Sequence, residues 1–218
     1  MSTSSNNILP NGIAAPSIRL YTCPIAKAHQ KLLPDSVDWI VTDPPYPKDY
    51  LAVYVDLARF ANRVLKPGGS LLCMCGQSYL LTVGTMLSSK LQYHWELAYL
   101  TPGGKSPQLF QKRVNSFWKP VLWFTKGDYS GKWIGDVSKS QVNDNDKRHH
   151  HWGQSESGIH DLIRRFAKPG DVVCDPFVGG GTVAVVAVRM GISFIGMDID
   201  KETVSRTRQR LAELEDAP

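Results

Sequence analysis

Three consecutive glycines, residues 179–181, separate two apolar runs of different character. The run before them, residues 172–174, predicts a buried strand, and the run after them predicts a helix. Glycine lets the backbone turn sharply and lets a ligand approach closely, while the first turn of a helix offers free N–H groups and a positive dipole end. About twenty residues later a second predicted strand ends at Asp198, whose carboxylate can accept hydrogen bonds from both ribose hydroxyls of an adenosine. The pattern therefore predicts a site for an adenosine-containing cofactor.

The same turn permits two other interpretations. Residues 179–184 fit the Gly-x-Gly-x-x-Gly/Ala fingerprint of dinucleotide sites, so a nicotinamide dehydrogenase is a competing hypothesis, and a purely structural strand-to-helix turn is another. Position disfavours the dehydrogenase. Only about twenty residues follow Asp198, so the second half of a dinucleotide fold would have to come first.

The most specific motif in the chain is Asp43-Pro44-Pro45-Tyr46. It follows the β-rich run 37–42, and its two prolines stop any strand or helix, so it forms a loop at the carboxyl end of a strand. The longer run 33–46 resembles the catalytic loop of the amino-methyltransferases, which methylate N6 of adenine or N4 of cytosine. The resemblance implies S-adenosylmethionine as cofactor and duplex DNA as partner.

The resemblance also implies a role for each residue of the loop. An exocyclic amine is a poor nucleophile because its lone pair is delocalised into the ring. The Asp43 carboxylate and the Pro44 carbonyl would accept its two N–H bonds and free the lone pair for attack on the methyl group. Pro44 and Pro45 would keep the loop stiff, and Tyr46 would stack on a base flipped out of the duplex. Asp at the first position favours adenine, since Ser is commoner among cytosine-N4 relatives.

The catalytic loop precedes the glycine turn, as in the permuted beta class of this family. Segments 66–70, 120–127, 151–156 and 168–171 also resemble that class, so the likeness spans roughly residues 18–200. It implies an α/β, Rossmann-like methyltransferase fold with circularly permuted motifs and a mostly parallel sheet. The residues expected to bind the cofactor are Asp175, Phe177, Gly179, Gly181, Thr182, Asp198, Gln154 and Ser155.

Three features depart from the usual pattern of the class. Many relatives have Gly-Asp, whose Asp meets the cofactor's adenine, where this chain has Tyr21-Thr22-Cys23, and many have Lys-Pro in place of Gln154-Ser155. The recognition insert, residues 127–151, is also short, at about 25 residues. Either recognition covers few bases or a second subunit, as in a homodimer, takes part.

Alternating strands and helices must position these motifs, as in an α/β fold. Helical spacing of apolar residues or similar patterning predicts helices over residues 51–65, 79–88, 155–166, 183–189 and 202–214. Apolar or β-rich runs predict strands over residues 37–42, 70–75, 93–100, 120–124, 172–174 and 193–197. We expect a flexible polar tail at residues 1–17 and one methyltransferase domain at residues 18–218.

The net charge of +5 and pI of about 9.0 suit a polyanionic partner. The expected DNA contacts come from the insert and from the loop 101–119; the alternative for each of them is a solvated surface position. These residues are Lys105, Lys112, Arg113, Lys132, Lys147 and Arg148.

Metal, disulfide and membrane classes are disfavoured. The four cysteines are scattered, and the closest two, Cys73 and Cys75, lie in an apolar run without a second pair, so we interpret them as core residues. Three adjacent histidines, residues 149–151, have no acidic or Cys partner at ligand spacing, so no metal is expected. No signal peptide and no spanning apolar run are visible, and we expect a cytoplasmic protein of bacterial or phage origin.

Together the motifs predict a site-specific DNA methyltransferase that acts on N6 of adenine, alone or within a restriction–modification system. A cytosine-N4 enzyme and an RNA substrate stay open. A non-catalytic nucleic-acid-binding relative is the third alternative, and the intact Asp43-Pro44-Pro45-Tyr46 loop argues against it.

Overall fold

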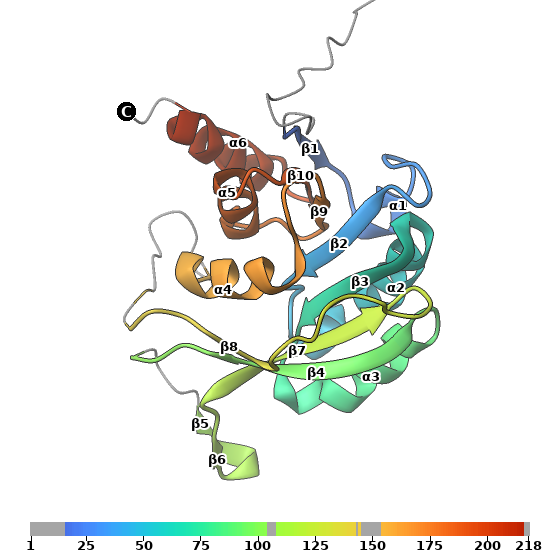
Figure 1. The fold of residues 1–218 in the computed structure, drawn as a ribbon. Helices are drawn as coiled ribbons and strands as arrows, with labels where there is room; N and C mark the ends of the chain where they lie inside the picture. Colours follow the sequence, from blue (N-terminus) through green and yellow to red (C-terminus); the bar gives the residue numbers. More distant parts are fainter. Residues whose placement is uncertain (1–15, 104–107, 143, 145–153, 216–218) are drawn as a thin grey trace, which may run out of the picture.

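One eight-stranded sheet organises the chain. The computed structural model describes residues 16–103, 108–142, 144 and 154–215 (Figure 1). Five strands are parallel neighbours: β1 (Ile18–Thr22), β10 (Ser193–Asp198), β9 (Val172–Asp175), β2 (Val37–Thr42) and β3 (Leu65–Met74). The sheet continues with β7 (Trp118–Thr125), antiparallel to both neighbours, then β4 (Gln92–Leu100) and the edge strand β8 (Val137–Lys139). The expected α/β fold with a mostly parallel sheet is confirmed.

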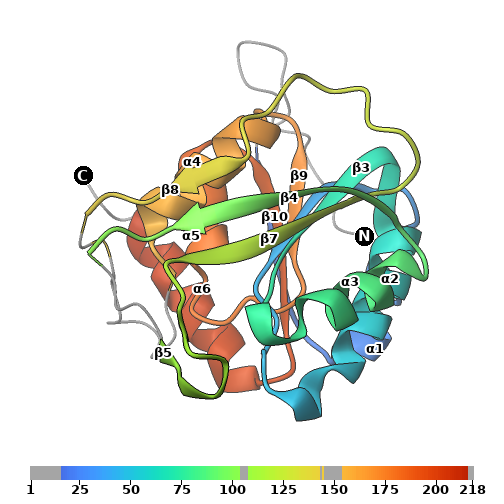
Figure 2. The same ribbon diagram turned by 90° about the horizontal axis from the view of Figure 1, so that it is seen from below.

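Helices of the described chain cover both faces of the sheet, as Figures 1 and 2 show. One face carries α1 (Ile25–Ala28), α2 (Ala52–Val64) and α3 (Leu80–Ser88), which bury their apolar sides in one core. The other carries α4 (Glu156–Phe166), α5 (Thr182–Arg189) and α6 (Lys201–Glu215), with a second core beneath them. Each of the five predicted helices is present within a few residues of its expected bounds. None of the helices in the described part of the chain is long and apolar enough to cross a bilayer.

Several segments are more structured than predicted, among them β1 and α1, which were not predicted. Strand β3 begins at Leu65, five residues before the expected start, because Gly68 and Gly69 exchange backbone hydrogen bonds with Lys126. The recognition insert contributes β8, which pairs with β4. The loop between β4 and β7 contains a small two-stranded ribbon, β5 (Gln108–Leu109) and β6 (Val114–Asn115).

Adjacent strands β2 and β9 create the crevice that a ligand needs. From β2 the chain leaves through the loop at Asp43 toward α2 on one face, whereas from β9 it leaves through the glycine turn toward α5 on the other. Open α/β sheets bind ligands outside the carboxyl ends of such a pair, because the two connections diverge there. The fold thus brings both predicted motifs to one edge of the sheet.

Candidate active site

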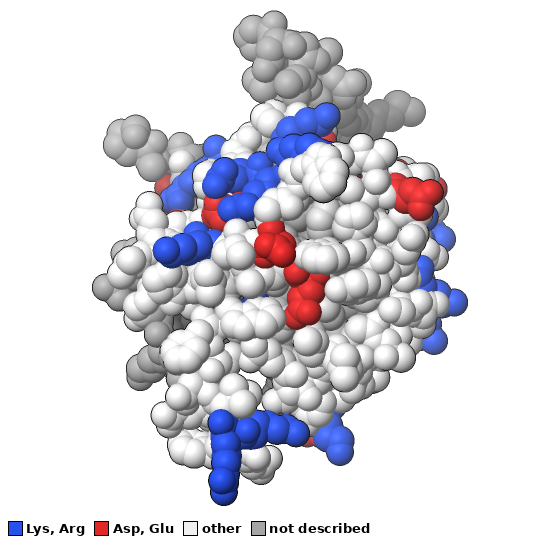
Figure 3. Space-filling model, turned by 60° about the horizontal axis from the view of Figure 1, so that its bottom comes forward, with Lys and Arg blue, Asp and Glu red and all other residues white. Residues whose placement is uncertain are grey.

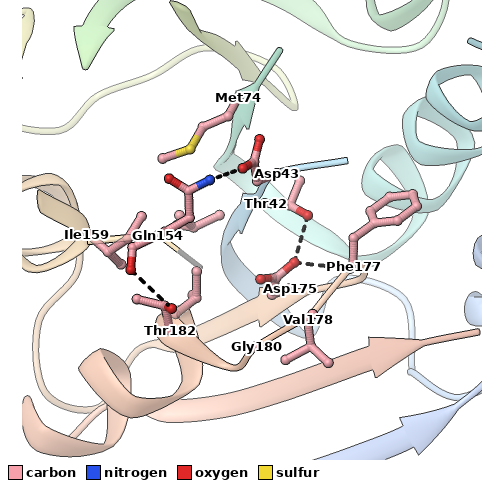
Figure 4. A pocket seen from close by; sticks show the side chains of 13 residues that line it. Thr42, Asp43, Met74, Gln154, Ile159, Asp175, Phe177, Val178, Gly180 and Thr182 are labelled. Atoms are coloured by element: carbon pink, nitrogen blue, oxygen red, sulfur yellow. Dashed lines mark hydrogen bonds between the residues drawn. The ribbon is translucent and has the colours of Figure 1, made fainter. Parts of the chain in front are cut away.

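Asp43 and the glycine turn line the same pocket, at the carboxyl ends of β2 and β9 (Figure 4). The strand register pairs Ile40 with Cys174, so the two loops leave the sheet side by side. The other lining residues come from the ends of β2, β3 and β9, from the glycine turn, from α4 and the segment before it, and from the start of α5: Val41, Thr42, Met74, Gln154, Ile159, Asp175, Phe177, Val178, Gly179, Gly180, Thr182 and Val183. Segments more than a hundred residues apart therefore form one cavity.

The carboxylate of Asp43 is held by three side chains. The Tyr46 hydroxyl donates to Oδ1, and the Gln154 amide donates to Oδ2. The Lys119 ammonium lies 3.3 Å from Oδ2 and 5.4 Å from the centroid of the Tyr46 ring. Two donors and a cation thus fix the direction in which this carboxylate points.

The rest of the catalytic loop is anchored to the body of the protein. Pro44 is buried, and the buried Tyr54 of α2 donates its hydroxyl to the Pro45 carbonyl at 3.5 Å. A Cβ at Gly76 would lie 3.4 Å from Tyr46, so this glycine lets the tyrosine ring pack directly against backbone. Burial, and then the Asp43 carboxylate, raise the pKa of the Tyr46 phenol well above its usual value. Tyr46 therefore keeps its proton and acts as a donor.

Asp175 is the buried acid of the pocket. Its Oδ1 accepts a 2.7 Å hydrogen bond from the Thr42 hydroxyl and a 3.0 Å bond from the Phe177 N–H. Burial raises the pKa of Asp175 to about 7, with Asp43 and Asp198 adding to the rise and the two hydrogen bonds opposing it. A buried carboxyl in this state favours a cationic ligand, because a nearby positive charge stabilises its ionised form.

The glycine turn has the geometry that only glycine tolerates well. Gly179 and Gly181 have φ values of +48° and +75°. The Gly179 N–H donates to Asp198 Oδ2 at 3.1 Å, while the other Asp198 oxygen accepts from Asp200. Asp198 thus braces the turn from the end of β10, and neither Asp198 nor Gly181 is among the residues that line the pocket.

Helix α6 holds the outer side of the turn, a feature that sequence reasoning missed. The Thr207 hydroxyl donates to the Gly179 carbonyl at 3.0 Å, and the Arg210 guanidinium donates to the Gly180 carbonyl. Arg210 is only 8% exposed and also bonds Glu156 Oε1 at 2.6 Å. Since Glu156 opens α4 directly after Gln154 and Ser155, Arg210 links the two backbone walls of the pocket. The sequence feature that could have indicated this role of Arg210 is its spacing of three residues from Thr207, which puts both side chains on one face of α6.

The remaining predicted cofactor residues differ in position. Gln154 and Thr182 line the pocket, and the Thr182 hydroxyl is 3.5 Å from the Gln154 carbonyl. Ser155 is 2% exposed and instead caps α4, where its hydroxyl accepts from the Gly158 N–H at 3.0 Å and donates to Asp144. Lys119, which holds Asp43, carried no signal in the sequence beyond its charge.

The predicted DNA-contacting residues are only partly within the described chain. Lys112 and Arg113 are exposed on the β5–β6 ribbon, and Lys132 is exposed in the insert. Lys105, Lys147, Arg148 and the three histidines lie outside the described residues. On the face shown in Figure 3, basic side chains are spread over the upper left, the right edge and the bottom, with acidic side chains near the centre. The four cysteines are buried, as predicted.

Known proteins share both the sequence pattern and the fold. Residues 37–209 match the N6_N4_Mtase family model, described as DNA methylase. The type II methyltransferase M.HpaI of Haemophilus parainfluenzae is 28% identical over 88% of this chain and 74% of its own length. The type II methyltransferase M2.DpnII of Streptococcus pneumoniae is 26% identical over 83% and 84%, respectively.

Two solved structures are similar in fold. PvuII DNA methyltransferase, which is cytosine-N4-specific, superposes with a TM-score of 0.75 at 18% identity, over 90% of this chain and 88% of its own. The complex of M1.HpyAVI with SAM superposes with a TM-score of 0.73 at 19% identity, over 89% and 98%. At 18% and 19% identity these superpositions show that the chain has the same fold as the two enzymes, and they show no more than the fold.

Proposed function

The chain belongs to the N6/N4 family of DNA methylases, and from that premise we propose that it transfers the methyl group of S-adenosylmethionine to N6 of adenine in duplex DNA. The observation that carries the proposal is the shared pocket: Asp43 and the glycine turn line one cavity. An amine held at Asp43 would lie beside a cofactor held at the turn. Asp43 itself, rather than Ser, is the residue that favours adenine over cytosine.

The pocket suits this cofactor chemically. S-adenosylmethionine supplies a methyl group on a sulfonium, which is a good leaving group, so no strong general base is needed. Asp175 is a buried carboxyl that favours a cation, and the first turn of α5, beginning at Thr182, offers free N–H groups. Asp198 lies at the end of the adjacent strand, within reach of a ribose, and Phe177 adds an aromatic surface. We assign the cofactor to these residues together with Gly179, Gly181, Gln154 and Ser155.

Catalysis in this proposal depends on the loop after β2. Asp43 and the Pro44 carbonyl accept the two N–H bonds of the amine, and Tyr46 stacks on the extruded base. Lys119 and Gln154 occupy Asp43 Oδ2, whereas among the described residues Oδ1 accepts from the Tyr46 hydroxyl alone, so Oδ1 is the oxygen with room to accept from the amine. After methyl transfer Asp43 accepts the proton that the nitrogen loses.

Labelled cofactor tests both the reaction and the base. Purified protein is incubated with methyl-labelled S-adenosylmethionine and plasmid DNA, and the DNA is digested to nucleosides and separated. We expect label in N6-methyladenine and none with Asp43→Ala, which should still bind S-adenosylhomocysteine. Label in N4-methylcytosine alone would refute the choice of base. DNA binding without transfer by either protein would support the non-catalytic alternative.

The proposed DNA contacts are tested separately. Lys112, Arg113 and Lys132 are exposed cations of the ribbon and the insert, and we assign Lys105, Lys147 and Arg148 to the same role. Replacing a phosphate-contacting lysine weakens binding to all sequences and reduces the salt slope by about one. Arg59, exposed on α2, provides a control cation that should leave the slope unchanged. An unchanged slope in Lys112→Ala would remove that residue from the interface.

A further inference from the structure

The β5–β6 ribbon stands at the rim of the proposed active site. It leaves the sheet between Leu100 and Trp118, which pair across β4 and β7, at the edge where β3 ends (Figure 1). The Ser116 hydroxyl donates to the Gln77 side chain, directly beside Gly76, on which Tyr46 packs. Lys119 follows three residues later and binds Asp43. The base of the ribbon is therefore fixed to the catalytic loop through Lys119, and to the segment after β3 that packs on Tyr46 through Ser116.

The tip of the ribbon, residues 110–113, combines an apolar ring with two cations. Phe110 is 81% exposed, and Lys112 and Arg113 beside it are exposed as well. A single exposed apolar side chain is ordinary, but Val114 in β6 and Phe117, two residues after β6, are exposed as well. Arg113 has a φ of +53°, a conformation that ends the short turn containing Phe110. Apolar surface flanked by positive charge fits a partner with phosphates outside and stacked rings inside, which is duplex DNA.

We propose that Phe110 enters the duplex beside the flipped base, while Lys112 and Arg113 hold the neighbouring phosphates. The proposal rests on the proposed function, since only an enzyme that extrudes a base creates the gap that the ring fills. Extrusion breaks stacking and pairing at a cost of a few kcal/mol. An inserted aromatic ring restores stacking worth about 1–3 kcal/mol per base, so Phe110 would stabilise the extruded state.

The test uses two DNA duplexes that differ only opposite the target base. One has the normal partner base, and the other has an abasic site there, so that extrusion breaks no base pair. The target base and its flanking sequence are those found to be methylated in the DNA labelling experiment described above. Phe110→Ala is compared with Leu33→Ala, which removes an apolar side chain that is 76% exposed just before β2, at the opposite end of that strand.

We expect Phe110→Ala to lower kcat/KM about 10- to 100-fold on the paired duplex, which corresponds to the stacking of one base. On the abasic duplex extrusion breaks no base pair but still breaks the stacking that the ring replaces, so Phe110→Ala should lose a similar factor there, and Leu33→Ala should match wild type on both. Equal activity of Phe110→Ala and wild type on the paired duplex would overturn the proposal, as would a loss confined to the paired duplex, which would tie Phe110 to pairing and not to stacking. If wild type methylates neither duplex, the proposed function itself fails.

Fluorescence gives a second readout that does not depend on turnover. With 2-aminopurine at the target position, wild type should raise the emission as the base leaves the stack, and Phe110→Ala should raise it less at saturating protein. The same emission from both proteins would contradict the insertion of Phe110. Thermal melting of the variant should match wild type, because the side chain is exposed.

Discussion

Thr42 and Asp175 are joined by a 2.7 Å hydrogen bond between the carboxyl ends of β2 and β9. Thr42 immediately precedes Asp43, and Asp175 begins the segment that leads into the glycine turn. The bond therefore couples the strand that carries the catalytic loop to the strand that carries the cofactor turn. It also lowers the pKa of Asp175, a buried carboxyl of the pocket, and so opposes the larger rise that burial causes.

The affinity for S-adenosylmethionine should rise with pH through about 7. Burial raises the pKa of Asp175 to about 7, so below that pH the carboxyl is protonated. A bound cation favours the ionised form, and binding below pH 7 must therefore release a proton, which weakens affinity by up to tenfold per pH unit. Calorimetry from pH 5.5 to 8.5 in buffers of different ionisation enthalpy measures this release. A flat affinity across that range would contradict the prediction, and Asp175→Asn should abolish the pH dependence.

The same ionisation predicts the pH dependence of stability without cofactor. The folded-state pKa of Asp175 is raised from 3.8 to about 7, so this residue contributes stability that is complete below its unfolded pKa and lost as pH rises through about 7. The slope of the free energy of unfolding against pH should be smaller in Asp175→Asn over this window. Urea titrations at a series of pH values measure the difference, and identical slopes would show that Asp175 ionises alike in both states.

Thr42→Val should move the pH midpoint of cofactor binding upward. Valine keeps the shape of the side chain but removes the donor that lowers the pKa of Asp175. The loss of a hydrogen bond to a buried acid should also cost about 1–3 kcal/mol of stability. Thr42→Ser keeps the hydroxyl and should retain the wild-type midpoint, while Thr85→Val on α3 serves as a control at an exposed site. A midpoint that does not move in Thr42→Val would show that the bond has no influence on Asp175.

Arg210→Met should weaken cofactor binding more than it slows the reaction. The guanidinium fixes the Gly180 carbonyl and Glu156, and its loss loosens both walls of the pocket. We expect KM for S-adenosylmethionine to rise about 10- to 100-fold, with kcat at saturation within a few fold of wild type, and Arg210→Lys to rescue part of the loss. Arg208→Met, an exposed position on the same helix, is the control. A lower melting temperature with an unchanged KM would reduce Arg210 to a purely structural residue.

Gly181→Ala should be more damaging than Gly191→Ala. Both glycines have positive φ, at +75° and +67°, so alanine at either costs about 1–2 kcal/mol in backbone strain. At Gly181 the new Cβ would also lie 2.8 Å from Thr207 Cγ2, whereas nothing lies within 4 Å at Gly191. Chemical denaturation should resolve the difference, and cofactor affinity should fall only in Gly181→Ala. Equal destabilisation by both changes would mean that the Thr207 side chain moves away from the new Cβ without lowering the free energy of unfolding.

The local features of this protein were determined by its sequence. The proline pair after residues 37–42 and the glycines at 179–181 interrupt apolar runs, and backbone restrictions at Pro and Gly act within a few residues. Strands β2, β9 and β10 and helices α2 and α4 therefore lie close to their expected bounds. Strand β8 and the β5–β6 ribbon were not predicted. Their sequences have no hydrophobic periodicity, and they form strands only because they pair with other segments of the chain.

The tertiary structure alone decided which side chains meet. The contacts of Asp43 with Lys119 and Gln154, and of Arg210 with Gly180, join segments 30 to 111 residues apart. Such pairs leave no periodic or local trace, since they arise only when the order of strands in the sheet brings distant loops to one edge. The sequence by itself determined the chemistry available to the site, and the sheet topology determined the geometry in which that chemistry is arranged.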